Sequence, residues 1–232
     1  MNRKIFFFMF FLVLIMLQKL YGINIQNSDK ELSSYFTFEY NRALNYCWDI
    51  STVGSLKFKD RHIVKSGLAM GGTGNIFNIK GFIGGETSFF TSFPVNLSLN
   101  YSYNGLPAYE NHTHSILFLA SIKRQWWGVS AGTSFRFTSF FGEPAVFEPI
   151  LSFLVYVFFI NNDTLKLGLR IANFDNFTSG NMGAYFLNIN SSVRLSERLS
   201  LINEIEILQS GSIALASNFY GIVYKGGVTF SW

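Results

Sequence analysis

The chain has 232 residues, of which 14% are charged, 18% are aromatic and 27 are phenylalanine. Because about 25% of residues are charged in a typical soluble domain, this composition excludes an ordinary solvated surface. After residue 22 the longest apolar run is residues 153–160, far below the roughly 18 residues that a membrane-spanning helix needs.

The N-terminus has the three parts of a secretory signal peptide. Asn2-Arg3-Lys4 is basic, residues 5–17 are an unbroken apolar run of 13 residues, and residues 18–22 end in a small residue. We predict cleavage after Gly22, so that residues 1–22 are the signal peptide of an exported protein. The alternative is a retained helical anchor, but at about 1.5 Å per residue the run covers only about two thirds of a bilayer core.

Loss of this segment removes Arg3, Lys4 and Lys19, which lowers the formal net charge from +4 to +1. A charge this small gives no reason to expect a nucleic-acid partner. The single cysteine, Cys47, excludes an intramolecular disulfide, and no Cys/His spacing indicates a structural metal or a cofactor.

Residues 23–32 are polar and predict a short periplasmic leader, and residues 33–232 are predicted to form one β domain. In this domain, segments of about ten residues alternate apolar and polar side chains, as transmembrane β-strands do. The clearest segment is residues 95–104, where Val95, Leu97, Leu99, Tyr101 and Tyr103 alternate with Asn and Ser. A soluble β-sandwich or lipocalin-like barrel also alternates, but its exterior carries more Lys and Glu.

The connections between these segments alternate in length. Tight turns are predicted at residues 59–61, 91–94, 123–125, 161–163 and 196–198, and longer loops at residues 44–48, 71–75, 105–114, 141–149, 173–183 and 210–218. Eleven connections predict an all-β, antiparallel up-and-down barrel of twelve strands with both termini on the periplasmic side. Ten strands remain an alternative, because residues 48–74 alternate poorly and are compatible with one irregular hairpin.

The predicted inward face carries charged residues of both signs. Because the apolar sets before and after the turn at residues 196–198 share one face, Leu195 pairs with Leu199, and Asn188 then lies beside Glu206. Two interpretations remain open: the charges line a water-filled lumen and tune ion selectivity, or they form a salt-bridge network that stiffens a closed barrel. The charged residues predicted to face the lumen are Glu39, Arg136, Lys166, Arg170, Arg194, Glu204, Glu206 and Lys225.

One predicted strand, residues 150–160, is apolar on both faces, as a strand covered on both sides would be. Pairing it with the strand that starts at Leu165 across a two-residue turn predicts an inner apolar wall. Its members are Phe153, Val155, Val157 and Phe159. The leader, a folded-in loop or a hydrophobic ligand are the candidates to cover this wall.

Two pairs of side chains are candidates for particular roles at the ends of strands. Trp126 and Trp127 flank a tight turn, where an aromatic girdle meets the membrane interface. His112 and His114 share one strand face, as metal ligands or a base do, but no supporting catalytic motif accompanies them. We therefore expect no enzyme and no metal site.

The chain ends in Tyr224-Lys225-Gly226-Gly227-Val228-Thr229-Phe230-Ser231-Trp232, a strand with one wholly apolar face. A polar residue (Lys225), Gly227, Phe230 and the terminal aromatic Trp232 make this end similar to the assembly signal of bacterial outer-membrane β-barrels. The resemblance implies a small porin-like barrel in the outer-membrane lipid bilayer, with the β-barrel assembly machinery as a partner. It implies passive passage of small solutes or of a hydrophobic compound. The alternative is a surface-exposed adhesin or a structural barrel with a closed lumen.

Overall fold

The computed structural model describes residues 29–41, 45–58, 61–73, 76–89, 95–107, 110–141, 143–177, 184–212 and 216–232. The predicted signal peptide, residues 1–22, lies outside the described residues, as do residues 23–28 of the predicted leader. None of the helices within the described ranges is both long and apolar enough to span a membrane.

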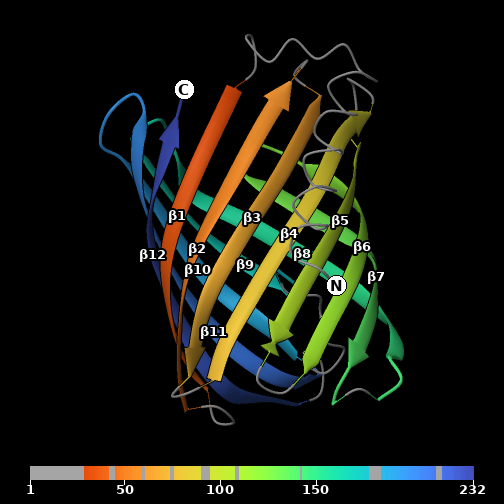
Figure 1. The fold of residues 1–232 in the computed structure, drawn as a ribbon. Coiled ribbons are helices and arrows are strands. Elements are labelled where there is room, and N and C mark those ends of the chain that lie inside the picture. Colours follow the sequence, from red (N-terminus) through yellow and green to blue (C-terminus); the bar gives the residue numbers. More distant parts are fainter. Residues whose placement is uncertain are drawn as a thin grey trace.

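Twelve antiparallel strands form a closed barrel, which confirms the predicted fold and strand number (Figure 1). Each strand pairs with its neighbours in sequence, and β1 pairs with β12 to close the barrel. The ten-strand alternative is wrong, because residues 48–58 of β2 pair in regular register with residues 62–72 of β3 and each is a separate strand of the twelve. The strands are β1 (Asp29–Asn41), β2 (Asn45–Phe58), β3 (His62–Thr73), β4 (Ile76–Phe89), β5 (Val95–Leu106), β6 (Asn111–Lys123), β7 (Trp127–Ser139), β8 (Val146–Asn161), β9 (Leu165–Ala172), β10 (Ala184–Arg194), β11 (Leu199–Ser212) and β12 (Ala216–Ser231).

The seam between β1 and β12 begins earlier than the alternation predicts. β1 starts at Asp29 rather than at Ser33, because the backbone of Lys30 exchanges two hydrogen bonds with that of Trp232, at 3.1 and 3.0 Å. Further along the seam Tyr35 lies opposite Gly227. A Cβ on Gly227 would lie 2.4 Å from the carbonyl oxygen of Ser34 and 2.8 Å from the Tyr35 ring, so only glycine allows this close approach.

Side chains along each strand alternate between an apolar outer surface and a polar interior. On β12, for example, Ile222, Tyr224 and Val228 are exposed on the outside, whereas Val223 and Thr229 are buried inside. The Asp, Glu, Lys and Arg side chains of the described strand residues have the inward parity, apart from Lys30 at one end of the barrel. The barrel therefore presents an apolar surface outward and its charges inward.

The two ends of the barrel differ. Strands β2, β4, β6, β8 and β10 end at the predicted tight turns, and the start of β1 and the end of β12 lie at this same end, called the turn rim below. The opposite end is called the loop rim. Several predicted loops there are shorter than expected; β5 continues to Leu106 and β6 begins at Asn111 within the predicted loop 105–114.

Candidate functional site

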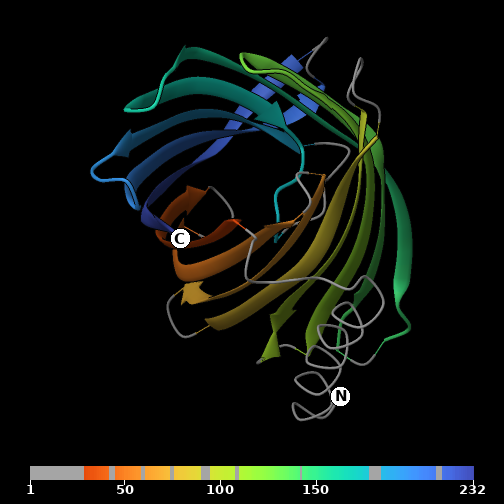
Figure 2. The same cartoon turned by 90° about the horizontal axis from the view of Figure 1, so that it is seen from above.

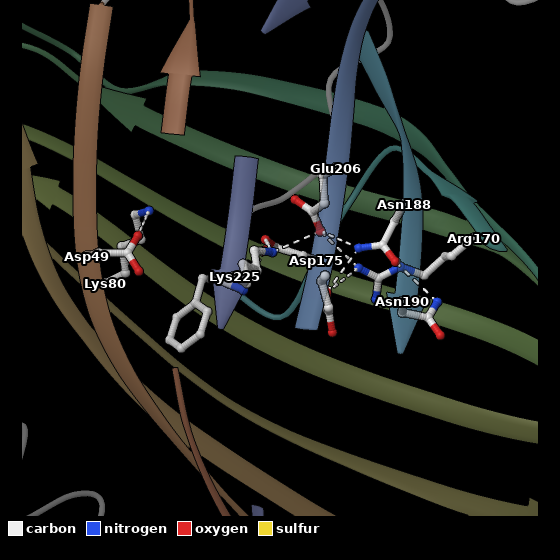
Figure 3. A network of polar contacts seen from close by, with 10 residues as sticks. Asp49, Lys80, Arg170, Asp175, Asn188, Asn190, Glu206 and Lys225 are labelled. Atoms are coloured by element: carbon white, nitrogen blue, oxygen red, sulfur yellow. Dashed lines mark hydrogen bonds and ion pairs between the residues drawn. The ribbon is translucent and has the colours of Figure 1, made fainter. Parts of the chain in front are cut away.

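Four of the charged residues predicted to face the lumen meet on the inner wall of β9, β11 and β12 (Figure 3). One carboxylate oxygen, Glu206 Oε1, accepts hydrogen bonds from Arg170 Nη2 at 3.0 Å and Lys225 Nζ at 2.9 Å. Glu204 Oε2 lies 3.6 Å from Arg170 Nη2. The predicted register holds, since Asn188 pairs with Glu206 and Asn190 with Glu204.

Asn188 and Asn190 on β10 complete this group, called the ionic network below. Asn188 Nδ2 donates to Glu204 at 3.0 Å and to Glu206 at 3.1 Å, and Asn190 Nδ2 donates to Asn188 Oδ1 at 3.2 Å. The Glu206 side chain is only 5% exposed, so its charge depends on these partners rather than on water. The acids and bases on this side of the wall are thus paired with one another.

Residues 173–177, which follow β9, turn into the barrel instead of extending outward (Figure 2). Its start is anchored by Asn173, whose Oδ1 accepts from the Phe153 N–H at 2.9 Å and whose Nδ2 donates to the Leu151 carbonyl at 2.7 Å. The Asn173 N–H donates to the Phe153 carbonyl at 3.3 Å. A single asparagine thereby replaces the strand pairing that ends at Ala172 and directs the following residues inward.

Residues 173–177, called the crossing segment, then reach the opposite wall. Asp175 Oδ2 lies 3.9 Å from Lys225 Nζ, so the segment contacts the ionic network. Further on, the Asn176 carbonyl accepts from Asn100 Nδ2 of β5 at 3.3 Å, and Phe177 packs edge to face against Phe82 of β4. The segment therefore runs from the β9 side of the lumen to the β4–β5 side.

Sequence reasoning placed residues 173–183 in an external loop and missed this crossing. The signal was present in Phe174 and Phe177, because two aromatic residues in a predicted water-exposed loop need apolar contacts. Phe174 is 8% exposed. A folded-in loop was one of the candidates to cover the inner apolar wall.

On the turn-rim side of the crossing segment, the lumen holds a cavity of about 840 Å³. The segment bounds it on one side through Phe174, Asp175 and Asn176. The cavity reaches the turn rim at Asp163 and Glu197. Arg170, Glu204, Lys166 and Arg194 of the predicted lumen set line it, and Glu31, Lys65, Glu86 and Lys123 line the facing wall.

The predicted inner apolar wall is wrong in its residues. Val155, Val157 and Phe159 are exposed on the outer surface, and Phe153 lies opposite Ala131 with the same outward parity. The cause is a β-bulge: Phe158 pairs with Gly168 and Ile160 with Leu167, so Phe159 is an extra residue. One inserted residue exchanges the faces of the strand beyond it. The inner wall is formed by the other set, Leu154, Tyr156 and Phe158.

The remaining predicted lumen residues lie nearer the rims. Arg136 forms an ion pair with Glu148 at 2.6 Å beside a second, smaller cavity at the loop rim. Glu39 lies on the inner face of β1, opposite Val223 and Cys47. Two inner-wall ion pairs were not recognised as pairs from the sequence, Lys123–Glu86 at 2.6 Å and Lys80–Asp49 at 3.2 Å. Lys123 was assigned to a turn, whereas β6 extends to include it.

The histidine pair faces outward at the loop rim. Nδ1 of His114 lies 2.8 Å from the Tyr101 hydroxyl, and Nδ1 of His112 lies 2.9 Å from the Tyr103 hydroxyl. The His112 and Tyr103 rings are stacked. These contacts assign both histidines to an aromatic surface cluster outside the lumen. Trp126, Trp127 and Trp232 are likewise exposed on the outside, at the turn rim.

No protein-family model and no curated protein sequence matches this chain. Solved structures with a similar fold include the KdgM porin in complex with disordered oligogalacturonate, at 9% identity and a TM-score of 0.57, covering 87% of this chain and 99% of that one. The NanC porin has 9% identity and a TM-score of 0.59, covering 86% and 98%. The translocator domain of the autotransporter NalP from Neisseria meningitidis has 10% identity and a TM-score of 0.52, covering 95% of each chain. At these identities the likeness shows the fold alone.

Proposed function

We propose that this chain is a porin-like barrel of the bacterial outer membrane that lets small solutes pass through a lumen narrowed by the crossing segment. The observation that carries the proposal is the 840 Å³ cavity lined by charged and polar side chains inside a closed barrel with an apolar exterior. Large side chains such as Phe36, Ile50, Leu97 and Phe118 are each close to half exposed on that exterior. Such a surface is stable against lipid and aggregates in water.

The difference between the two rims supports one orientation in the membrane. Both ends of the barrel chain and the tight turns lie at the turn rim, which we assign to the periplasm, and the aromatic residues Trp126, Trp127 and Trp232 lie at that end. Export through a cleaved signal peptide and folding by the β-barrel assembly machinery through Lys225, Gly227, Phe230 and Trp232 belong to the same proposal. We propose no enzymatic role.

The charges where the crossing segment meets the wall favour cations. Asp175, Glu204 and Glu206 carry three negative charges in contact with two positive charges, those of Arg170 and Lys225. The Asp175–Lys225 contact of 3.9 Å and the Glu204–Arg170 contact of 3.6 Å are long, and both carboxylates line the cavity. A small cation near these groups meets a net negative potential at the narrow part of the lumen.

Conductance of the refolded full chain in a planar lipid bilayer tests this function. We expect stepwise currents with a reversal potential that reports cation preference in a salt gradient. Glu204→Gln is expected to lower that preference, because it removes a cavity-lining negative charge. Glu148→Gln is the matched control, since Glu148 pairs with Arg136 near the loop rim. An equal cation preference in wild type and in Glu204→Gln would contradict the role of Glu204 in cation selectivity.

The second candidate function is a closed barrel with a structural or adhesive role, and the crossing segment is the observation that favours it. Its contacts with β4, β5 and β12 occupy the middle of the lumen. Electrical silence from protein that circular dichroism shows to be folded β would support this candidate over passage. In that case the connections at the loop rim are the candidate binding surface.

A further inference from the structure

The lining of the cavity includes an apolar wall and a cationic wall, besides acids such as Glu31, Glu86 and Glu204. Large apolar side chains of β6 and β8 line one part of the cavity, while β9 and β10 contribute lysine and arginine. The apolar wall consists of Leu117, Leu119, Leu154, Tyr156 and Phe158.

The rings of Tyr156 and Phe158 lie against the inner surface of the barrel wall instead of filling the lumen. A Cβ on Gly128 of β7 would lie 2.4 Å from the Tyr156 ring, and a Cβ on Gly168 of β9 would lie 2.8 Å from the Phe158 ring. Each ring therefore covers a glycine on a flanking strand, which leaves the space above it open. Because Phe158 lies opposite Gly168 on β9, the apolar wall reaches the strand that carries Lys166.

Two positive charges of the cationic wall, those of Lys166 and Arg194, have no acid partner among the residues that the structure describes, whereas Arg170 is paired with Glu204 and Glu206. Lys166 has no carboxylate within ion-pair distance among the residues that the structure describes. Arg194 donates to two backbone carbonyls, those of Ser196 at 3.1 Å and Glu197 at 2.9 Å. Lys166 pairs with Ser192 on β10, so Lys166 and Arg194 are diagonal neighbours on one face. Both lie on the turn-rim side of the ring of Phe158.

We propose that this cavity binds an amphiphilic anion, a small carboxylate with an aromatic or aliphatic body. The carboxylate contacts Lys166 and Arg194, and the body lies on Phe158, Tyr156 and Leu154 toward the crossing segment. The cavity volume of about 840 Å³ is within the range of small-molecule sites, about 300–1,000 Å³. A purely hydrophilic anion makes no use of the apolar wall, and an uncharged apolar compound leaves the cations without a partner.

This inference adds to the proposed function an anion site nearer the turn rim than the acids Asp175 and Glu204, which favour cations beside the crossing segment. It rests on the lumen being accessible to solutes. Binding is measured without passage, by isothermal titration calorimetry of the full chain in lipid nanodiscs. Empty nanodiscs provide the correction for partition into lipid. The probe is 4-phenylbutyrate, compared with 4-phenylbutanol, which lacks the charge, and with acetate, which lacks the body.

We expect 4-phenylbutyrate to bind at least about tenfold more tightly than either comparison compound, since a charge-assisted contact or a buried ring each contributes that much. Lys166→Gln with Arg194→Gln is expected to abolish the preference for the acid over the alcohol. Phe158→Ala with Tyr156→Ala weakens binding of both aromatic probes, and Phe158→Leu is a milder substitution if the double variant does not fold. Phe159→Ala, on the outer surface, and Lys57→Gln, which pairs with Asp29 at the turn rim, are matched controls.

Equal affinity for the acid and the alcohol, or for acetate and 4-phenylbutyrate, overturns the proposal. An unchanged affinity in both lumen double variants also overturns it. Because calorimetry does not require conduction, a barrel that is silent in planar bilayers but binds the probe disproves passage and retains the site. A conducting barrel that does not bind the probe retains passage and disproves the site.

Discussion

Phe177 and Phe82 meet edge to face in the lumen, with ring centroids 4.9 Å apart and ring planes at 88°. Phe82 belongs to β4, whereas Phe177 follows β9, so this contact joins opposite parts of the barrel wall. Asn173 fixes the near end of the crossing segment with three hydrogen bonds, at 2.7, 2.9 and 3.3 Å. Among the described residues, the far end contacts the wall through the aromatic pair and through one 3.3 Å hydrogen bond that Asn100 Nδ2 donates to the Asn176 carbonyl.

Removal of the Phe177 ring is therefore expected to release the far end of the crossing segment from β4 and β5. An edge-to-face pair contributes about 0.5–1.5 kcal/mol beyond its buried area, so Phe177→Ala lowers the ratio of closed to released segment by at least about twofold to tenfold. We expect a larger single-channel conductance in planar bilayers. Phe118→Ala, which removes an exposed ring from the outer surface, is the control. Conductance in Phe177→Ala equal to that of wild type would show that the segment does not limit the current.

Removal of the charge of Glu206 is expected to destabilise the barrel. Glu206 Oε1 accepts hydrogen bonds from Arg170, Asn188 and Lys225, and its side chain is 5% exposed. Glu206→Gln keeps the shape but weakens two charge-assisted bonds, so the free energy of unfolding should fall by about 1.5–3 kcal/mol. Urea unfolding in lipid vesicles measures the change. Glu148→Gln, at a carboxylate that is 46% exposed, should change it by at most about 1 kcal/mol.

Because of the bulge in β8, we expect the effect of a one-residue deletion to depend on which residue is removed. Phe159 has no partner on β9, since the pairing passes from Phe158 to Ile160. Deleting Phe159 should therefore leave both parts of the strand in register and the barrel folded. Deleting Val155 instead exchanges the faces of part of β8, exposing inner residues to lipid. The altered mobility of folded barrels in unheated gel electrophoresis distinguishes the two variants; similar folded fractions would contradict the assigned bulge.

The seam between β1 and β12 should not tolerate a side chain at Gly227. The added Cβ meets the Ser34 carbonyl oxygen at 2.4 Å, and the backbone cannot move without separating the paired strands. Gly227→Val is expected to reduce the yield of folded barrel and to cost at least about 1–3 kcal/mol of stability. Gly54→Val is the matched control, because no atom lies within 4 Å of its added Cβ. Equal yields would show that the seam opens at little cost.

The C-terminal residues supply a test in cells. Phe230 and Trp232 are 43% and 52% exposed on the outer surface, so their loss removes little internal packing. Phe230→Ala with Trp232→Ala should lower the amount of protein in the outer membrane while leaving spontaneous refolding into lipid vesicles nearly unchanged. Phe36→Ala with Phe38→Ala is a control on the facing strand β1. Unchanged outer-membrane levels would count against recognition of these two residues by the assembly machinery.

Alternation along single strands and the alternating lengths of the connections were sufficient to predict the barrel, its twelve strands, with ten as the alternative, and the register that brings Asn188 beside Glu206. Period-two patterning is local, because neighbouring side chains on a strand must face opposite sides wherever one side is lipid. The sequence also predicted that Arg170, Glu204, Glu206 and Lys225 face inward. It left open whether they pair or line water, because that depends on distances between strands.

Two features were decided only by tertiary structure. The bulge at Phe159 is invisible to alternation in a strand that is apolar on both faces, so the inner wall was assigned to Val155 and Val157 instead of Leu154 and Tyr156. The inward course of the crossing segment depends on the hydrogen bonds of the Asn173 side chain to the backbone of β8. It depends also on the contact of Phe177 with Phe82, which lies 95 positions earlier in the chain. Contacts between residues so distant in sequence leave no periodic signal, because they depend on how the closed barrel brings its walls together.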